Sequence, residues 1–243
     1  MRGRGQVTIF VIIAVLIVVT VILFFVFREK ISGEKPLDVN VAPAYDYVIN
    51  CLEETGNNAI KDVGEKGGYA LVIDDVDFVE QVPHYLIGER KLIPSVEGIE
   101  AEISFIVMNE LSYCILNFNN LDDDYDEINH ELRNVKTTIL ENAVVIELDY
   151  PIRINKKEST YEISEFSFNF KSRLYDYYLI SEKIVNEQQE HPRSFCVSCL
   201  YDIGEEYDVN VDMYDYGNST VFSIIDEEYK INDEVYEWRF AIK

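Results

Sequence analysis

The chain has 243 residues, of which 48% are hydrophobic, and its formal net charge is −24. Residues 1–35 hold five of the 21 basic and two of the 45 acidic side chains, so residues 36–243 hold 16 basic against 43 acidic ones, a net charge of −27. A charge of this sign and size repels nucleic acid and anionic lipid surfaces, so we expect no nucleic-acid partner.

Near the amino terminus, Val7–Phe27 is an apolar run of 21 residues without a charge. As a helix it extends about 31 Å, enough to cross the hydrocarbon core of a bilayer. The run ends in aromatic residues suited to a membrane interface, and the charged Arg28 follows them. The sequence therefore predicts a short tail over 1–6, a transmembrane helix over 7–27 and a linker over 28–43.

Basic residues flank the predicted membrane span on both sides, so the positive-inside rule does not fix its orientation. An even number of cysteines, four, is compatible with disulfides in an oxidising compartment. The sequon at Asn218–Thr220 makes Asn218 a candidate N-glycosylation site in a turn-like stretch. We therefore expect a single-pass protein of the cell membrane whose acidic domain, residues 44–243, lies outside the cytoplasm.

The first half of this domain has the periodicity of two long helices. Apolar residues recur at helical spacing over 43–66 and again over 95–120. Between them we expect a short strand in "YALVI", from Tyr69, and an irregular stretch with Pro83 and Pro94. The acidic segment "DDDYDEINHELR" lacks the Gly and the final Glu of a calcium loop, so it predicts a solvated loop.

Strands dominate the second half. Alternation of apolar and polar residues predicts strands over 144–150 and 160–170, the second with an irregularity near Ser164 and Glu165. A third helix over 172–189 and a short fourth helix, capped by Ser194 and ending near Glu205, come next. Three closing strands are expected over 207–214, 219–226 and 234–242. This order indicates an α+β fold in which a mostly antiparallel sheet packs with helices.

The cysteines are the best candidates for chemistry. Cys51 and Cys114 lie beside the apolar stripes of the two long helices, so a disulfide can join those helices. Two buried free thiols are the alternative.

The pair Cys196 and Cys199, in "CVSC", permits three interpretations: a second disulfide, two buried thiols, or a catalytic redox pair at a helix start. The preceding thioredoxin-like βαβ context is missing, and a four-cysteine zinc site would need a second such pair.

No other pattern points to catalysis. His84, His130 and His191 belong to no metal or triad motif, and no phosphate-loop or dinucleotide fingerprint occurs. We therefore expect no catalytic, cofactor-binding or metal-binding residues, and no cofactor. The 17 tyrosines, several in "YDYY" and "YDYG", suit sheet and core positions or a contact surface.

The segment "RGRGQVTIF" resembles the archaeal class III signal peptide of pilin-like proteins. The resemblance implies cleavage by a membrane peptidase between Gly5 and Gln6. The pilin pattern carries Ser at the third mature position, where this chain has Thr8, and Glu at the fifth, where it has Phe10. In pilins that Glu is associated with packing one subunit against the next.

Several longer stretches, among them "VINCLEETGNNAIKDVGEKGGY", "NELSYCILNF" and "WRFAIK", are similar to single-pass archaeal membrane proteins. The resemblance implies an architecture and carries no catalytic residues. We therefore expect a cell-surface protein with a structural, adhesive or partner-binding role, and not an enzyme. The partner is a protein of the envelope or a second copy of the chain. The alternatives are an envelope thiol–disulfide exchange enzyme using Cys196 and Cys199, or a small-ligand receptor.

Overall fold

The computed structural model describes residues 38–71, 77–121 and 125–243. The predicted transmembrane helix, most of the predicted linker and the candidate cleavage site at Gly5 and Gln6 lie outside these ranges. Within them, no helix is long and apolar enough to span a membrane. The chain divides into two compact units, Met1–Ala42 and Pro43–Lys243, and the folded domain is the second of these.

This domain has the predicted α+β class, with four α-helices and two sheets among its described residues. The helices are α2 (Ala42–Glu65), α3 (Val96–Ile115), α4 (Leu174–Glu190) and α5 (Val197–Tyr207), and a 3₁₀ segment, η1 (Leu116–Leu121), continues α3. The two long helices and the third one are thus confirmed. The prediction of a single sheet is wrong, because the strands divide into one antiparallel and one mixed sheet.

The antiparallel sheet is built around its longest strand. Its strands are β4 (Glu127–His130), β5 (Asn134–Leu140), β6 (Ala143–Lys156) and β7 (Ser159–Lys171). β4 and β5 both pair with β6, and β7 pairs with β6 as well. Since β4 begins at Glu127, the acidic segment that contains it is part strand and not only a solvated loop.

The predicted irregularity in this sheet is confirmed. The β6–β7 register shifts between the pairs Asp149↔Glu165 and Ile152↔Ile163. On β7 the apolar residues before the shift have odd numbers and those after it have even numbers. The shift lets both sets face the same side of the sheet.

The mixed sheet joins the middle of the chain to its end. Its strands are β1 (Phe78–Val79), β2 (Val82–Ile87), β3 (Arg90–Lys91), β8 (Asn210–Tyr216), β9 (Ser219–Ile231) and β10 (Glu234–Ile242). The order is β1-β2-β10-β9-β8, with β3 also on β2, and β2 runs parallel to β10. The stretch around Pro83, expected to be irregular, is therefore strand β2. The described part of the expected "YALVI" strand, Tyr69–Leu71, is not in a strand.

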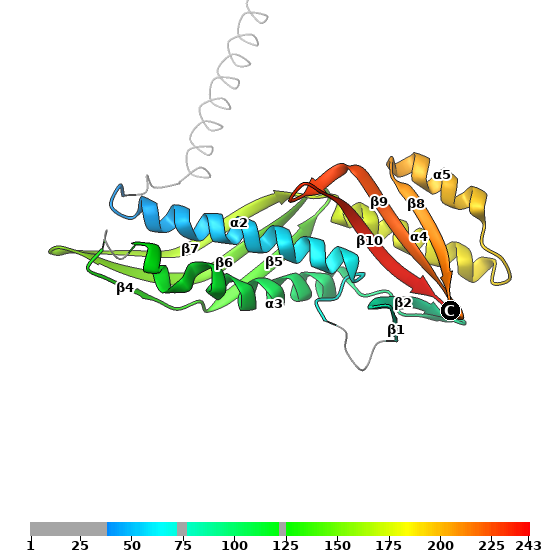
Figure 1. The fold of residues 1–243 in the computed structure, drawn as a ribbon, viewed down its shortest axis with the longest axis horizontal. Helices are drawn as coiled ribbons and strands as arrows, with labels where there is room; N and C mark the ends of the chain where they lie inside the picture. Colours follow the sequence, from blue (N-terminus) through cyan, green and yellow to red (C-terminus); the bar gives the residue numbers. More distant parts are fainter. Residues whose placement is uncertain (1–37, 72–76, 122–124) are drawn as a thin grey trace, which may run out of the picture. The chain divides into compact units, whose positions relative to one another are not determined.

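Helices α2 and α3 lie side by side against the antiparallel sheet (Figure 1). The approach of α2 is close at Gly56, where an added Cβ would lie 2.2 Å from Cζ of Phe170. Helix α3 covers the edge of β5, because Glu100 and Ser104 accept the backbone N–H groups of Ile139 and Thr137. Those two edge donors are thus satisfied by side chains in place of a further strand.

Helix α4 is joined to the mixed sheet by a buried carboxylate. Asp226 on β9 is 1% exposed and accepts hydrogen bonds from Arg173, the Tyr177 hydroxyl and two backbone N–H groups. Burial and the nearby Asp226 charge raise the pKa of Tyr177, so its hydroxyl stays a donor. Arg173 also donates to the carbonyl of Tyr207, which fixes the end of α5 to the same point.

Candidate functional site

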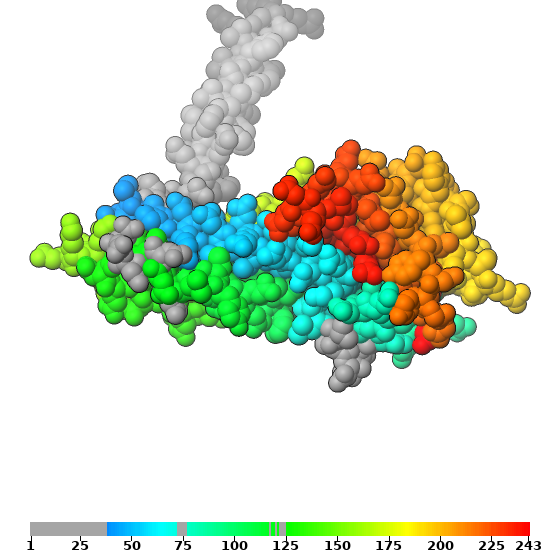
Figure 2. Space-filling view, in the orientation of Figure 1, coloured from blue at the N-terminus to red at the C-terminus, as the bar shows by residue number. Residues whose placement is uncertain are grey.

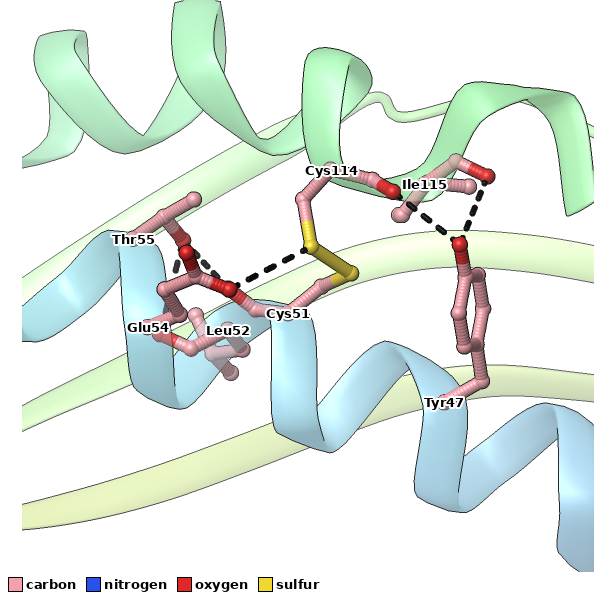
Figure 3. The surroundings of a disulfide bond; sticks show 7 residues. All are labelled: Tyr47, Cys51, Leu52, Glu54, Thr55, Cys114 and Ile115. Atoms are coloured by element: carbon pink, nitrogen blue, oxygen red, sulfur yellow. Dashed lines mark hydrogen bonds between the residues drawn. A yellow bond between two sulfur atoms is a disulfide. The ribbon is translucent and has the colours of Figure 1, made fainter.

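The Cys51–Cys114 disulfide is present and joins α2 to α3 (Figure 3). Cys51 is 3% exposed, and Sγ of Cys114 lies 4.0 Å from Oε2 of Glu54. One helical turn away, the Tyr47 hydroxyl donates to the carbonyl of Cys114 at 3.0 Å, which ties the same two helices again. This arrangement fits a structural cross-link better than a reactive site, since one of its two sulfurs is shielded from solvent.

The second pair, Cys196 and Cys199, also forms a disulfide, and the described residues contain no free cysteine. Both residues are half-buried, whereas Leu200 beside them is buried. Cys196 is the N-cap of α5, and its Sγ accepts the backbone N–H of Cys199 at 3.3 Å. The predicted cap at Ser194 is therefore wrong by two residues, and the helix begins directly at the disulfide.

The last turn of α4 places an acid and an imidazole beside this disulfide. Oε1 of Glu187 lies 3.5 Å from Sγ of Cys199 and 3.3 Å from Nε2 of His191. The donor atoms of Glu187, Cys196 and Cys199 all lie within 4.8 Å of one another, as do those of Glu187, Glu190 and His191. Sequence reasoning missed Glu187 and His191 because they precede the cysteines on a different helix. The spacing E-x₃-H-x₄-C-x₂-C matches no metal-binding motif, and only the fold shows that the two helices meet.

The loop between α4 and α5 is held at its α5 end, and a salt bridge joins the two helices away from the loop. Phe195, directly before Cys196, packs edge-on against Phe222 of β9 with ring centroids 5.3 Å apart. Lys183 on α4 pairs with Glu206 on α5 at 2.7 Å. These contacts fix the orientation of the two helices, and with it the positions of the acid, the imidazole and the two sulfurs.

A second constellation escaped the sequence analysis, because its members are far apart along the chain. Nδ1 of His84 lies 3.0 Å from the carbonyl oxygen of Asp77, and Nε2 lies 2.8 Å from the hydroxyl of Ser219. The carbonyl can only accept, so Nδ1 donates to it, and Nε2 is left to form the hydrogen bond with Ser219. His84 is 2% and Ser219 6% exposed, so this contact is a buried joint between the two sequence-distant strands β2 and β9.

The irregularity in the antiparallel sheet leaves a hollow of about 770 Å³, lined among others by His130, Arg133, Arg153 and Glu162. Burial lowers the pKa of His130, whose Nδ1 lies 2.8 Å from the Tyr150 hydroxyl. Both arginines already pair with glutamates, Arg133 with Glu131 and Arg153 with Glu162. The positive charges that line the hollow are therefore neutralised by the glutamates, and the hollow is not an anion-binding site.

The candidate glycosylation residue, Asn218, is exposed in the two-residue turn between β8 and β9. Gly217 supplies the positive φ, +63°, at the first position of that turn. The hydroxyl of Thr220 in the sequon donates to Asp215 at 2.7 Å. Glycosylation at Asn218 stays a prediction.

Comparison of the chain with protein-family models, with curated proteins and with solved structures finds no match.

Proposed function

We propose that the chain is a membrane-anchored cell-surface protein whose acidic domain has a structural or partner-binding role outside the cytoplasm, and that it is not an enzyme. The Cys51–Cys114 disulfide carries this proposal. Disulfides form and persist mainly in oxidising compartments, so this buried cross-link between two core helices supports an exterior location. The apolar run Val7–Phe27 supports the anchor, and its pilin-like start supports targeting through a class III signal peptide.

Strand β8 is our choice for the contact surface. Among the described strands it pairs only with β9, and six of its seven residues are exposed. Met213, Tyr214 and Tyr216 are 38–46% exposed there, and Tyr201 on α5 is 67% exposed. Figure 2 shows α5 and β8 next to each other at the surface. Tyrosine offers large contact area at low entropic cost, and an unpaired strand edge can accept an extended segment.

The negative charge at β8 indicates the chemistry of the partner. Asp212 and Asp215 are exposed on β8, and Glu80 lies 3.3 Å from the Tyr214 hydroxyl. A second copy of the domain, with its net charge of −26, would meet like charge at this edge. We therefore propose that the edge binds an extended, basic segment of another envelope protein.

Topology is tested by adding protease to intact cells that produce the full-length chain. The proposal expects digestion of residues 44–243 without lysis. Protection of the domain until the cells are lysed would contradict the exterior location. Mass spectrometry of the amino terminus in the same sample shows whether cleavage has occurred after Gly5.

The contact surface is tested by photo-crosslinking in intact cells. A photo-reactive residue replaces Tyr216 on β8, and in a matched control it replaces Tyr113 on α3, which is 77% exposed. We expect a protein adduct from position 216 with a peptide rich in Lys or Arg, and none from 113. Equal adducts at both positions, or an adduct with a second copy of the chain, would rule out the proposed edge interaction.

Thiol–disulfide exchange is the second candidate, because Cys196–Cys199 lies half-exposed at a helix start. The position at a helix N-terminus favours this reaction, because it stabilises a thiolate. The nearby Glu187 carboxylate argues against the reaction, because a negative charge disfavours a thiolate. The test is reduction of a disulfide substrate by the reduced full-length protein. Turnover lost in Cys196→Ser but kept in Cys51→Ala/Cys114→Ala would establish the exchange reaction.

A further inference from the structure

We propose that the reduced Cys196–Cys199 pair, together with Glu187 and His191, binds one Zn²⁺ ion, so that this end of α4 and α5 is a redox-controlled metal site. The proposal uses the pair of the second candidate function but does not rest on any exchange activity. It adds two ligands that no sequence motif indicated. Thiolate, carboxylate and imidazole are the groups that zinc takes as ligands in proteins.

The distances from Glu187 to Cys199 and to His191 fit a tetrahedral zinc ion. A zinc–sulfur bond is about 2.3 Å long, and zinc–oxygen and zinc–nitrogen bonds are about 2.0–2.1 Å long. At tetrahedral angles these bond lengths place a sulfur and an oxygen ligand about 3.6 Å apart, and an oxygen and a nitrogen ligand about 3.4 Å apart. The distances here are 3.5 Å from Cys199 Sγ to Glu187 Oε1 and 3.3 Å from Glu187 Oε1 to His191 Nε2. Two ligand pairs therefore already have the spacing that zinc requires. The exposed His191 side chain must also turn toward the sulfurs, because it does not lie within 4.8 Å of Glu187 together with either cysteine.

The fourth ligand, Cys196, can move into its position on the zinc ion once the disulfide has opened. Sγ of Cys196 lies within 4.8 Å of Glu187 and Cys199. Cys196 is the N-cap of α5, so turning its side chain gives up the hydrogen bond from the Cys199 N–H but leaves the backbone hydrogen bonds of the helix in place. The ring of Phe195 against Phe222 holds the backbone of this connection in place. Reduction therefore needs a local side-chain rearrangement and not a change of fold.

The chemistry balances through a dithiol reductant. One reductant molecule passes two electrons and two protons to the Cys196–Cys199 disulfide and leaves as its own disulfide. Zn²⁺ then displaces the two thiol protons and binds both sulfurs as thiolates. Because a disulfide sulfur cannot supply a thiolate, the oxidised chain has only the half-buried Glu187 and the exposed Glu190 and His191 to offer, without a sulfur ligand. Zinc and the disulfide thus exclude each other.

The test measures zinc bound to the full-length protein, before and after reduction with a phosphine that does not compete for the metal. We expect no zinc in the oxidised protein and one ion per chain in the reduced protein. Cobalt in place of zinc should give the intense visible absorption of a tetrahedral site and a thiolate charge-transfer band. A reduced protein that takes up no zinc, or a cobalt spectrum without thiolate, would overturn the proposal.

Variants assign the ligands. Glu187→Gln and His191→Gln should each weaken zinc binding at least about tenfold, the loss expected when even an outer partner of a metal site is removed. Glu190→Gln is the matched control on the same turn and should leave the affinity unchanged. Cys51→Ala/Cys114→Ala should still bind one ion, which locates the site at the other pair. If Glu190→Gln weakens binding and Glu187→Gln does not, the assignment of ligands is wrong.

The two proposals for this cysteine pair fail separately. Zinc bound without turnover of a disulfide substrate supports the metal site alone. Turnover without zinc uptake supports exchange alone and contradicts the metal site. Location outside the cytoplasm is tested independently of both by protease digestion of intact cells.

Discussion

At the scale of single residues, Gly56 determines how closely α2 can approach the antiparallel sheet. Replacing it by alanine places a Cβ 2.2 Å from Cζ of Phe170, whose ring is packed within the domain. The helix itself gains about 0.5–1 kcal/mol from alanine, whereas overpacking costs about 1–3 kcal/mol. We therefore expect Gly56→Ala to lower the free energy of unfolding, measured by urea denaturation of the full-length protein.

Gly98 on α3 is the matched control for this substitution. Its added Cβ meets only Oγ of Ser95, at an ordinary 3.5 Å, so Gly98→Ala should stabilise the protein. Phe170→Leu in the Gly56→Ala background should recover part of the loss. Equal stability of Gly56→Ala and the unmodified protein would mean that the helix moves away from the sheet at little cost.

Asp226 is a buried carboxylate whose charge contributes to the stability of the fold. Its Oδ1 accepts two backbone N–H groups, and its Oδ2 accepts from Arg173 and Tyr177. Asparagine in this position must turn an NH₂ group toward one of these donor pairs. We expect Asp226→Asn to cost about 3 kcal/mol of unfolding free energy, since it removes the buried negative charge that pairs with Arg173 and leaves buried donors without partners.

Asp176 provides the comparison for Asp226. It pairs with the same Arg173 at 3.1 Å but is 23% exposed, so water can replace the lost contact. Asp176→Asn should therefore cost less than about 1 kcal/mol. Similar losses in both variants would show that burial of Asp226 does not determine the strength of this network.

At the scale of elements, the two disulfides should differ in their effect on stability. Cys51 and Cys114 are 63 residues apart in sequence, whereas Cys196 and Cys199 are three apart. The chain-entropy relation gives about 4 kcal/mol for the long loop and about 2 kcal/mol for the short one. Cys51→Ala/Cys114→Ala should thus lower the urea midpoint more than Cys196→Ser/Cys199→Ser. The reverse order would make the short disulfide the structural one.

Elements defined by their own periodicity were predictable from the sequence, and elements defined by distant partners were not. Helix α2 has its apolar stripe within 24 residues, and the alternation in β6 is visible within seven. In β2, by contrast, Pro83 argues against a strand, and the strand forms because β10 pairs with it from the far end of the chain.

The same distinction explains the candidate site. Cys196 and Cys199 were predictable as a pair because they are adjacent on one helix turn. Their neighbours Glu187 and His191 belong to the preceding helix, and the contact between the two helices cannot be read from local spacing. Two of the proposed zinc ligands were therefore visible in the sequence, and two required the fold.

At the scale of the whole molecule, the charge of −24 should make the protein more stable in salt. Acidic side chains repel one another across the surface, and many, such as Glu53, are exposed. Raising KCl from 0.1 to 1 M shortens the screening length from about 10 to about 3 Å. Surface ion pairs are weakened too, but each contributes at most about 1 kcal/mol, and acidic residues outnumber basic ones 45 to 21.

We therefore expect the urea midpoint of the full-length protein to rise between 0.1 and 1 M KCl. The variant Glu53→Lys/Glu165→Lys, in which two exposed carboxylates become ammonium groups, should be more stable at low salt and should gain less from added KCl. A local effect at position 165 should also stabilise this variant. Glu165 lies directly opposite Asp149 in the β6–β7 pair, and like charges in such a pair destabilise a sheet. A midpoint that falls with KCl would mean that the ion pairs outweigh the repulsion.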